Sequence, residues 1–312
     1  MPLSDSMTYA RAHLVDAENG GLYHCISRCV RRAWLCGNDP VSGRSFEHRR
    51  QWLESRLLAL AEVFAVDLYA YAVMSNHYHA VLELVPGRAR GWSDEEVARR
   101  WCALGRRRDR EETEARVAAL LGDAERLAVV RERLGSLSWY MRYVNEPMAR
   151  RANREDEVTG RFWEGRFTSI ALLDEPAVLE CMAYVDLNPV RAGLAERAGA
   201  GAHTSIRRRL GDGEQTGAPL ADLGRLGLTL RGYHAVLEWS ASVERGGVLP
   251  PAPEAAEVLS RLGLRPEVWL ARVKVHRLRY RAYGALRLLR EYTEKLGQHW
   301  LRGARPGLAA PA

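Results

Sequence analysis

The chain has 312 residues, of which 47% are hydrophobic and 27% are charged, an ordinary globular composition whose length favours two domains. Lysine and arginine number 46 against 39 for aspartate and glutamate, and this net charge of +7 excludes an acidic solvating protein and favours a polyanionic partner. No run of about 18 apolar residues occurs, so we expect no membrane span. Because residues 1–16 lack the apolar core of a signal peptide, we expect a cytoplasmic protein.

Five cysteines are present, an odd number in a chain without an export signal. Cys25 and Cys29 are four positions apart and lack a second cysteine pair, so a zinc site is a weak alternative. We expect buried, reduced thiols.

The first third of the chain alternates between strand and helix patterns. Residues 21–34 and 66–74 are rich in β-formers, and 44–65 carries apolar residues at helical spacing. A tight turn at Ser75 and Asn76 joins the strand at 66–74 to a further strand at 77–85, which predicts an antiparallel hairpin.

Residues 93–154 are highly charged and helical in pattern. A strand is expected at 161–172, and then a helix for which Asp174 is the N-cap and which Pro189 ends near Asn188. The helices expected within the charged segment are 94–104, 111–121, 123–134 and 136–152.

The order of these elements predicts an α+β fold. Its first 200 residues form a ferredoxin-like split β-α-β domain with an antiparallel sheet, interrupted by the helical insertion at about 93–154. We expect a Gly-, Ala- and Arg-rich linker at 201–224, a mostly helical C-terminal region at 225–303 and a disordered tail at 304–312.

A His-X-His motif opens the second strand of the hairpin. Side chains alternate between the faces of a strand, so His77 and His79 project to one side and Tyr78 to the other. Two imidazoles so placed can share one divalent metal ion. The alternative is a pair of partly exposed strand histidines without a metal.

The helix that follows Asp174 carries Tyr184 and Asn188 one turn apart on one face. Val178, Met182 and Val185 form a separate apolar stripe that can seat this helix on the sheet. Tyr184 then lies at the margin of the stripe. The alternative is a tyrosine at the edge of the core and an asparagine that caps the helix end.

Together these motifs resemble the HUH single-tyrosine transposases, which include small insertion-sequence transposases and REP-associated tyrosine transposases. The resemblance covers roughly residues 20–195. The family usually has proline where this chain has Ser75, and the helical insertion and the residues after about Ala200 exceed its minimal domain. The segments that carry the resemblance are Tyr23 to Arg28, Ala72 to His79, Arg161 to Phe167 and Tyr184 to Gly193.

The resemblance implies a metal-dependent enzyme that cleaves and rejoins single-stranded DNA at hairpin-bearing ends. Tyr184 would attack phosphorus and form a 5′-phosphotyrosine, leaving a free 3′-hydroxyl. His77, His79 and Asn188 would hold Mg²⁺ or Mn²⁺, which makes an anionic phosphodiester open to attack. The implied partner is single-stranded or hairpin DNA, bound by a monomer or a homodimer.

Basic and aromatic residues suggest where DNA binds. Residues 272–290 hold eight basic side chains and no acid, which predicts a DNA-binding helix, although a solvated basic face is the alternative. Trp163 could equally be a core residue of its strand. The candidate DNA contacts are Arg28, Arg161, Trp163, Arg166, Arg191, Lys274, Arg277 and Arg281.

Two other functions are compatible with these motifs. One is an HUH nickase or replication initiator, for which a helicase or second-tyrosine motif is expected, and no P-loop pattern is present. The other is a domesticated DNA- or RNA-binding protein without catalysis. The presence of His77, His79, Tyr184 and Asn188 argues against it.

Overall fold

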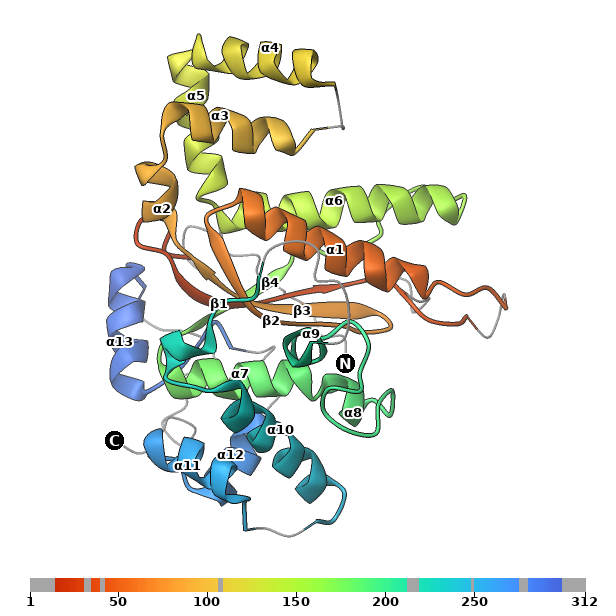
Figure 1. Ribbon diagram of the computed structural model, residues 1–312, viewed down its shortest axis with the longest axis vertical. Coiled ribbons are helices and arrows are strands. Elements are labelled where there is room, and N and C mark those ends of the chain that lie inside the picture. Colours follow the sequence, from red (N-terminus) through yellow and green to blue (C-terminus); the bar gives the residue numbers. More distant parts are fainter. Residues whose placement is uncertain are drawn as a thin grey trace.

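The computed structural model shows an α+β fold in which helices cover both faces of a five-stranded sheet, so the expected fold class is confirmed (Figure 1). None of the described helices combines the length and the hydrophobicity that a membrane crossing requires. The described residues are 15–30, 35–39, 43–105, 109–211, 219–247, 250–274 and 280–298.

The sheet has the order β2-β3-β1-β4-β5. Helix α1 (His48–Val63) connects β1 to β2, and β3 lies between those two strands, which is the split β-α-β arrangement. The first four strands pair antiparallel as expected, whereas β5 joins the edge of β4 in parallel. The strands are β1 (Gly21–Arg28), β2 (Val66–Val73), β3 (His77–Leu84), β4 (Thr168–Leu172) and β5 (Ala282–Tyr283).

The helical insertion and α1 cover one face of the sheet. Alternation along β1 and β3 points Cys25 and Tyr78 into this core. Pro86, directly after β3, stands in the first turn of an additional short helix, where its missing N–H costs nothing. The helices here are α2 (Pro86–Gly91), α3 (Asp94–Ala103), α4 (Arg110–Leu121), α5 (Ala124–Leu134) and α6 (Leu137–Glu155).

Two of the expected strands are shorter in the structure. The first ends at Arg28, and residues 31–34 lie outside the described part of the chain. The strand expected at 161–172 is restricted to β4. Trp163 makes only an isolated bridge to Cys29, and its indole N–H donates to the Asn145 carbonyl at 2.9 Å, so tertiary contacts replace the regular ladder there. All five cysteines are reduced, as expected, and Cys102 alone among them is not fully buried.

Helix α7 (Glu175–Asp186) covers the opposite face of the sheet. The Asp174 side chain accepts from the Ala177 N–H at 2.8 Å, which confirms the expected N-cap. Helix α7 ends at Asp186, and a one-turn helix, α8 (Asn188–Arg191), follows directly. Pro189 sits in the first turn of α8, where a proline is tolerated, so the chain changes direction there and remains helical.

Residues 201–211 pack against the domain in place of an extended linker. They contain α9 (Ser205–Leu210), and Thr204 forms a bridge with Ala72 beside the edge strand β2. Thr204, Ser205 and Ile206 are buried. The glycine- and arginine-rich composition concealed this packing because the segment is anchored by long-range hydrogen bonds to α7 and β2.

The described C-terminal region is mostly helical. The prediction of a single helix over 272–290, however, is wrong. Helix α12 ends at Val273, residues 275–279 lie outside the described part, and β5 precedes α13. Ala282 and Tyr283 pair with β4, and this long-range pairing overrides the basic helical pattern. The helices are α10 (Leu230–Glu244), α11 (Pro253–Arg261), α12 (Pro266–Val273) and α13 (Leu286–Lys295).

Helices α7, α10, α11 and α12 share one hydrophobic core, and Figure 1 shows α7 between the sheet and α10 to α12. Polar side chains reinforce this contact. The Tyr283 and Tyr233 hydroxyls donate to the buried carboxylates of Glu180 at 2.6 Å and Asp186 at 2.7 Å. The C-terminal region therefore holds the helix that carries Tyr184.

Glu54 of α1 connects residues 201–211 to the sheet. Its carboxylate accepts from the Tyr71 hydroxyl at 2.5 Å and pairs with His203 Nδ1 at 2.6 Å. Burial raises the pKa of Glu54, but the hydrogen bonds from His203 and Tyr71 outweigh burial and leave that pKa below its usual value.

We expect the Glu54→Gln variant to lose about 1 kcal/mol of stability at neutral pH and less in acid. The folded-state pKa is lowered, so the contribution of Glu54 is present above its unfolded pKa and disappears as the pH falls through its folded pKa. Urea unfolding of both proteins from pH 7 to pH 3 measures this. Glu62→Gln, at an exposed site on α1, is the control, and a difference that grows in acid would contradict the prediction.

Candidate active site

The two histidines of the His-X-His motif lie on one face of the sheet, as predicted, and α7 covers that face. Their ring centroids are 4.8 Å apart on β3, within the reach of one shared metal ion. His79 is buried, with 1% of its surface exposed, and His77 is half-buried. Tyr78 points to the other face, where its hydroxyl donates to Asn145 Oδ1 at 2.7 Å.

A third imidazole, which sequence reasoning did not place in the site, comes from β1. His24 is 1% exposed, and its Nε2 lies 2.9 Å from Nδ1 of His79, with the two rings stacked. The register sets Ile26 opposite His79, so alternation puts His24 on the same face. A histidine in the first strand is apparent from the sequence, but only the pairing of β1 with β3 shows that it contacts His79.

Tyr184 lies over these imidazoles within the same chain. Its ring centroid is 5.7 Å from that of His79 and 6.2 Å from that of His24, edge-on to both. The stripe of Val178, Met182 and Val185 is buried and turns Tyr184 toward the sheet, where only 7% of its surface is exposed. The structure thus brings together the tyrosine and the His-X-His motif, which are about a hundred residues apart in the sequence.

Asn188 and Arg191 flank the tyrosine from α8. The Asn188 side-chain N–H₂ donates to the Tyr184 carbonyl at 2.9 Å, so its Oδ1 is the atom available to serve a cation. The Arg191 guanidinium lies 5.6 Å from the centre of the Tyr184 ring and pairs with Glu244 at 2.7 Å. Arg191, predicted to contact DNA, therefore lies beside the tyrosine and forms an ion pair with Glu244 of α10.

The donor set fits a divalent cation of the transition series. Nδ1 of His77 contacts Asn76 Oδ1 at 2.6 Å, and Nδ1 of His79 contacts His24, so Nε2 is the nitrogen through which each imidazole could bind a metal. Asn188 Oδ1, water and a phosphate oxygen would complete the coordination. Within the described residues, no group of three or more His, Cys, Asp and Glu side chains is placed to hold a metal ion.

The predicted DNA contacts near β4 differ in their exposure. Trp163 packs on the buried Tyr78 ring, with centroids 5.9 Å apart, on the side of the sheet opposite the histidines. The indole is half-buried and packs against the core on that side. Arg161 and Arg166 are exposed and can reach a phosphate backbone.

The remaining predicted contacts lie on β1 and in the C-terminal region. Arg28 is half-buried and pairs in register with His77, so alternation along β1 puts it on the histidine face. Lys274 is exposed and Arg281 is half-buried, whereas Arg277 lies outside the described residues.

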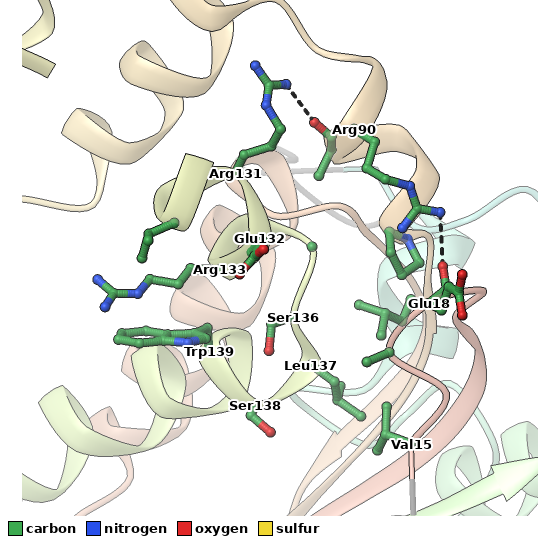
Figure 2. A pocket seen from close by; sticks show the side chains of 16 residues that line it. Val15, Glu18, Arg90, Arg131, Glu132, Arg133, Ser136, Leu137, Ser138 and Trp139 are labelled. Atoms are coloured by element: carbon green, nitrogen blue, oxygen red, sulfur yellow. Dashed lines mark hydrogen bonds between the residues drawn. The ribbon is translucent and has the colours of Figure 1, made fainter. Parts of the chain in front are cut away.

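A cavity of about 760 Å³ lies at the root of the helical insertion, lined by residues of α2, α5, α6 and the segment before β1 (Figure 2). Arg90 there donates to the Glu18 carbonyl at 2.9 Å, and Arg133 stacks 4.3 Å from the Trp139 ring. Leu84, also in its lining, is at the opposite end of β3 from His77, roughly 23 Å along the strand. This cavity contains no predicted site residue.

No family model matches the chain, and no curated protein matches it. Among solved structures, the chain is similar to a REP-associated tyrosine transposase bound to a REP hairpin. The TM-score is 0.34 and the identity is 12%, with 70% of this chain and 100% of that chain covered. A shared fold does not establish a shared function, which depends on the residues of the site.

Proposed function

We propose that this chain is a metal-dependent tyrosine transposase that cleaves and rejoins single-stranded DNA at hairpin-bearing ends through a covalent 5′-phosphotyrosine. One observation carries the proposal. The Tyr184 ring lies 5.7 Å from His79, which in turn lies 4.8 Å from His77, all within one chain. A nucleophile beside two metal-binding imidazoles is what phosphoryl transfer to a tyrosine requires.

The ligands suit an anionic substrate. When bound by His77 and His79, Mn²⁺ or Mg²⁺ would neutralise a non-bridging phosphate oxygen and polarise phosphorus. Both imidazoles are neutral ligands, as is Asn188 Oδ1, so they leave the full cationic charge to act on the phosphate. Imidazole nitrogen favours transition metals over Mg²⁺, and Mn²⁺ is therefore the ion of choice for the test.

The covalent step conserves the ester. The Tyr184 hydroxyl oxygen forms a bond to phosphorus while the bond from phosphorus to the 3′ oxygen breaks. The phenol loses its proton, and the departing 3′ oxygen gains one, which gives a free 3′-hydroxyl. A 3′-hydroxyl can reverse this attack, so neither cutting nor joining needs another energy source.

The surroundings of Tyr184 suit it to the nucleophilic role. The Arg191 cation faces the ring on which negative charge develops, and the Glu244 pair holds that cation in place. The low exposure of Tyr184 limits the access of water to the covalent adduct.

The test uses the full chain and a hairpin oligonucleotide with single-stranded flanks and a 5′-labelled or 3′-labelled end. With Mn²⁺ we expect a protein–DNA adduct stable to denaturant and a released strand with a free 3′-hydroxyl. Chelation of the metal should abolish both. DNA binding without any adduct, at every metal tried, would contradict the proposal and favour the non-catalytic binding protein.

We expect the double substitution Arg161→Gln and Arg166→Gln to weaken single-stranded DNA binding and to reduce its salt dependence. Each phosphate contact contributes about 0.7 to the slope of log affinity against log salt, so the slope should fall by about 1.4. Fluorescence anisotropy across a salt series measures this. Arg99→Gln, on the surface of α3 and paired there with Glu95 and Glu114, is the control.

An unchanged slope in the double variant would place the DNA elsewhere. Deleting the chain after residue 225 does not answer the same question. It would remove α10 to α12 from the core that surrounds α7, so a loss of binding would report on folding.

A further inference from the structure

We propose that His24 is a positioning residue that sets the tautomer of His79, so that the Nε2 lone pair of His79 faces the cation. The inference rests on the proposed function. It assigns a role to an imidazole that the His-X-His motif does not include. The observation behind it is the 2.9 Å contact between His24 Nε2 and His79 Nδ1.

Only one proton can occupy this contact. A neutral imidazole carries one N–H, and one of the two facing nitrogens must donate while the other accepts. If His79 Nδ1 donates, its proton is on Nδ1 and Nε2 has a lone pair for a metal. If His24 Nε2 donates instead, the His79 proton must sit on Nε2, where it blocks metal binding. The pair therefore couples the tautomer of His24 to the metal affinity of His79.

The hydrogen-bond partner of His77, the side-chain oxygen of Asn76, cannot switch between donor and acceptor as His24 can. The Asn76 Oδ1 atom, 2.6 Å from His77 Nδ1, can only accept, so His77 must carry its proton on Nδ1. His77 is therefore preset for a metal at Nε2. His79 reaches the same tautomer only when His24 accepts, and this makes His24 the variable partner of the two ligands.

Burial makes the contact specific. His24 and His79 are each 1% exposed, so bulk water cannot readily take the place of either imidazole. Strands β1 and β3 are paired along their whole length, which holds the two rings in register. Outer partners of this kind fix the orientation of ligating histidines in many metal sites, and their removal weakens metal binding about 10- to 100-fold.

Tyr184 also touches both rings, so DNA cleavage alone cannot isolate the role of His24. The experiment therefore titrates the full chain with Mn²⁺ alone and reads free ion by electron paramagnetic resonance. The variants are His24→Gln, whose side-chain oxygen can accept near the position of Nε2, and His24→Met, which has a similar size and only a weak acceptor. His234→Met, on α10, is the matched control.

We expect wild type, His24→Gln and His234→Met to bind Mn²⁺ with similar affinity, and His24→Met to bind about 10- to 100-fold more weakly. Long-range ¹H–¹⁵N spectra of the metal-free proteins at pH 8 give a second readout. His79 should carry its proton on Nδ1 in wild type and His24→Gln, and the Nε2–H form should appear in His24→Met. If His24→Met does not fold, His24→Asn, whose amide is too short to reach His79, replaces it.

The outcomes separate the two proposals. Wild-type Mn²⁺ binding that His24→Met retains in full would overturn the role of His24 and leave the proposed function standing. A wild-type protein that fails to bind Mn²⁺ yet shows the Nδ1–H tautomer at His79 would overturn the proposed metal site. A wild-type His79 with its proton on Nε2, while Mn²⁺ still binds, would overturn the role of His24 alone.

Discussion

Replacing Tyr184 with phenylalanine should abolish both DNA cleavage and the covalent adduct, while hairpin affinity changes by less than about 1 kcal/mol. The substitution removes only the attacking oxygen. The ring keeps its edge contacts with His24 and His79 and its place below Arg191, so packing is preserved. Denaturing gels of labelled hairpin DNA with Mn²⁺ report the adduct, and anisotropy reports the affinity.

Tyr78→Phe is the matched control, because Tyr78 is buried on the opposite face with its hydroxyl on Asn145. It should still form the adduct. An adduct that survives Tyr184→Phe and maps to another tyrosine would overturn the assignment of the nucleophile.

A mixture of two inactive variants tests whether each chain uses its own tyrosine. Tyr184 lies over the imidazoles of its own chain, so a mixture of the Tyr184→Phe and His79→Ala proteins should form no adduct. An adduct in the mixture would show that α7 is exchanged between two subunits.

Replacing Asp186 with alanine should lower the free energy of unfolding by about 3 kcal/mol, because it leaves several buried donors without their acceptor. The Asp186 carboxylate accepts from Ser205 Oγ at 2.6 Å, from the Ile206 N–H at 2.9 Å and from the Tyr233 hydroxyl at 2.7 Å. These bonds join α7 to α9 and α10 two residues beyond Tyr184. We therefore expect slower adduct formation as well, from a less firmly held nucleophile.

The Asp186→Asn variant keeps the size of the side chain and one oxygen acceptor but removes the charge, so it shows how much the charge alone affects stability. Burial raises the pKa of Asp186, against the lowering effect of the Ser205 and Tyr233 hydrogen bonds. The folded-state pKa is raised, so wild type should lose stability relative to Asp186→Asn as the pH rises through that pKa. Urea unfolding at pH 4 and pH 7 measures both effects. Stability unchanged in Asp186→Ala would contradict the anchoring role.

Local patterns in the sequence determined much of this site. Alternation along one strand was enough to put His77 and His79 on one face and Tyr78 on the other. The N-cap Asp174 and the apolar stripe of Val178, Met182 and Val185 located the helix that carries Tyr184. Such features depend on neighbours a few residues away, which a periodicity of two or of 3.6 residues records directly.

Only the tertiary structure decided what these elements meet. His24 contacts His79 across 55 residues because β1 and β3 pair in one particular register, and no periodicity encodes that register. For the same reason the expected linker proved to be packed against Asp186, and part of the expected basic helix proved to be strand β5. Pairing and packing between distant segments override local propensity, and they placed Tyr184 over the imidazoles of its own chain.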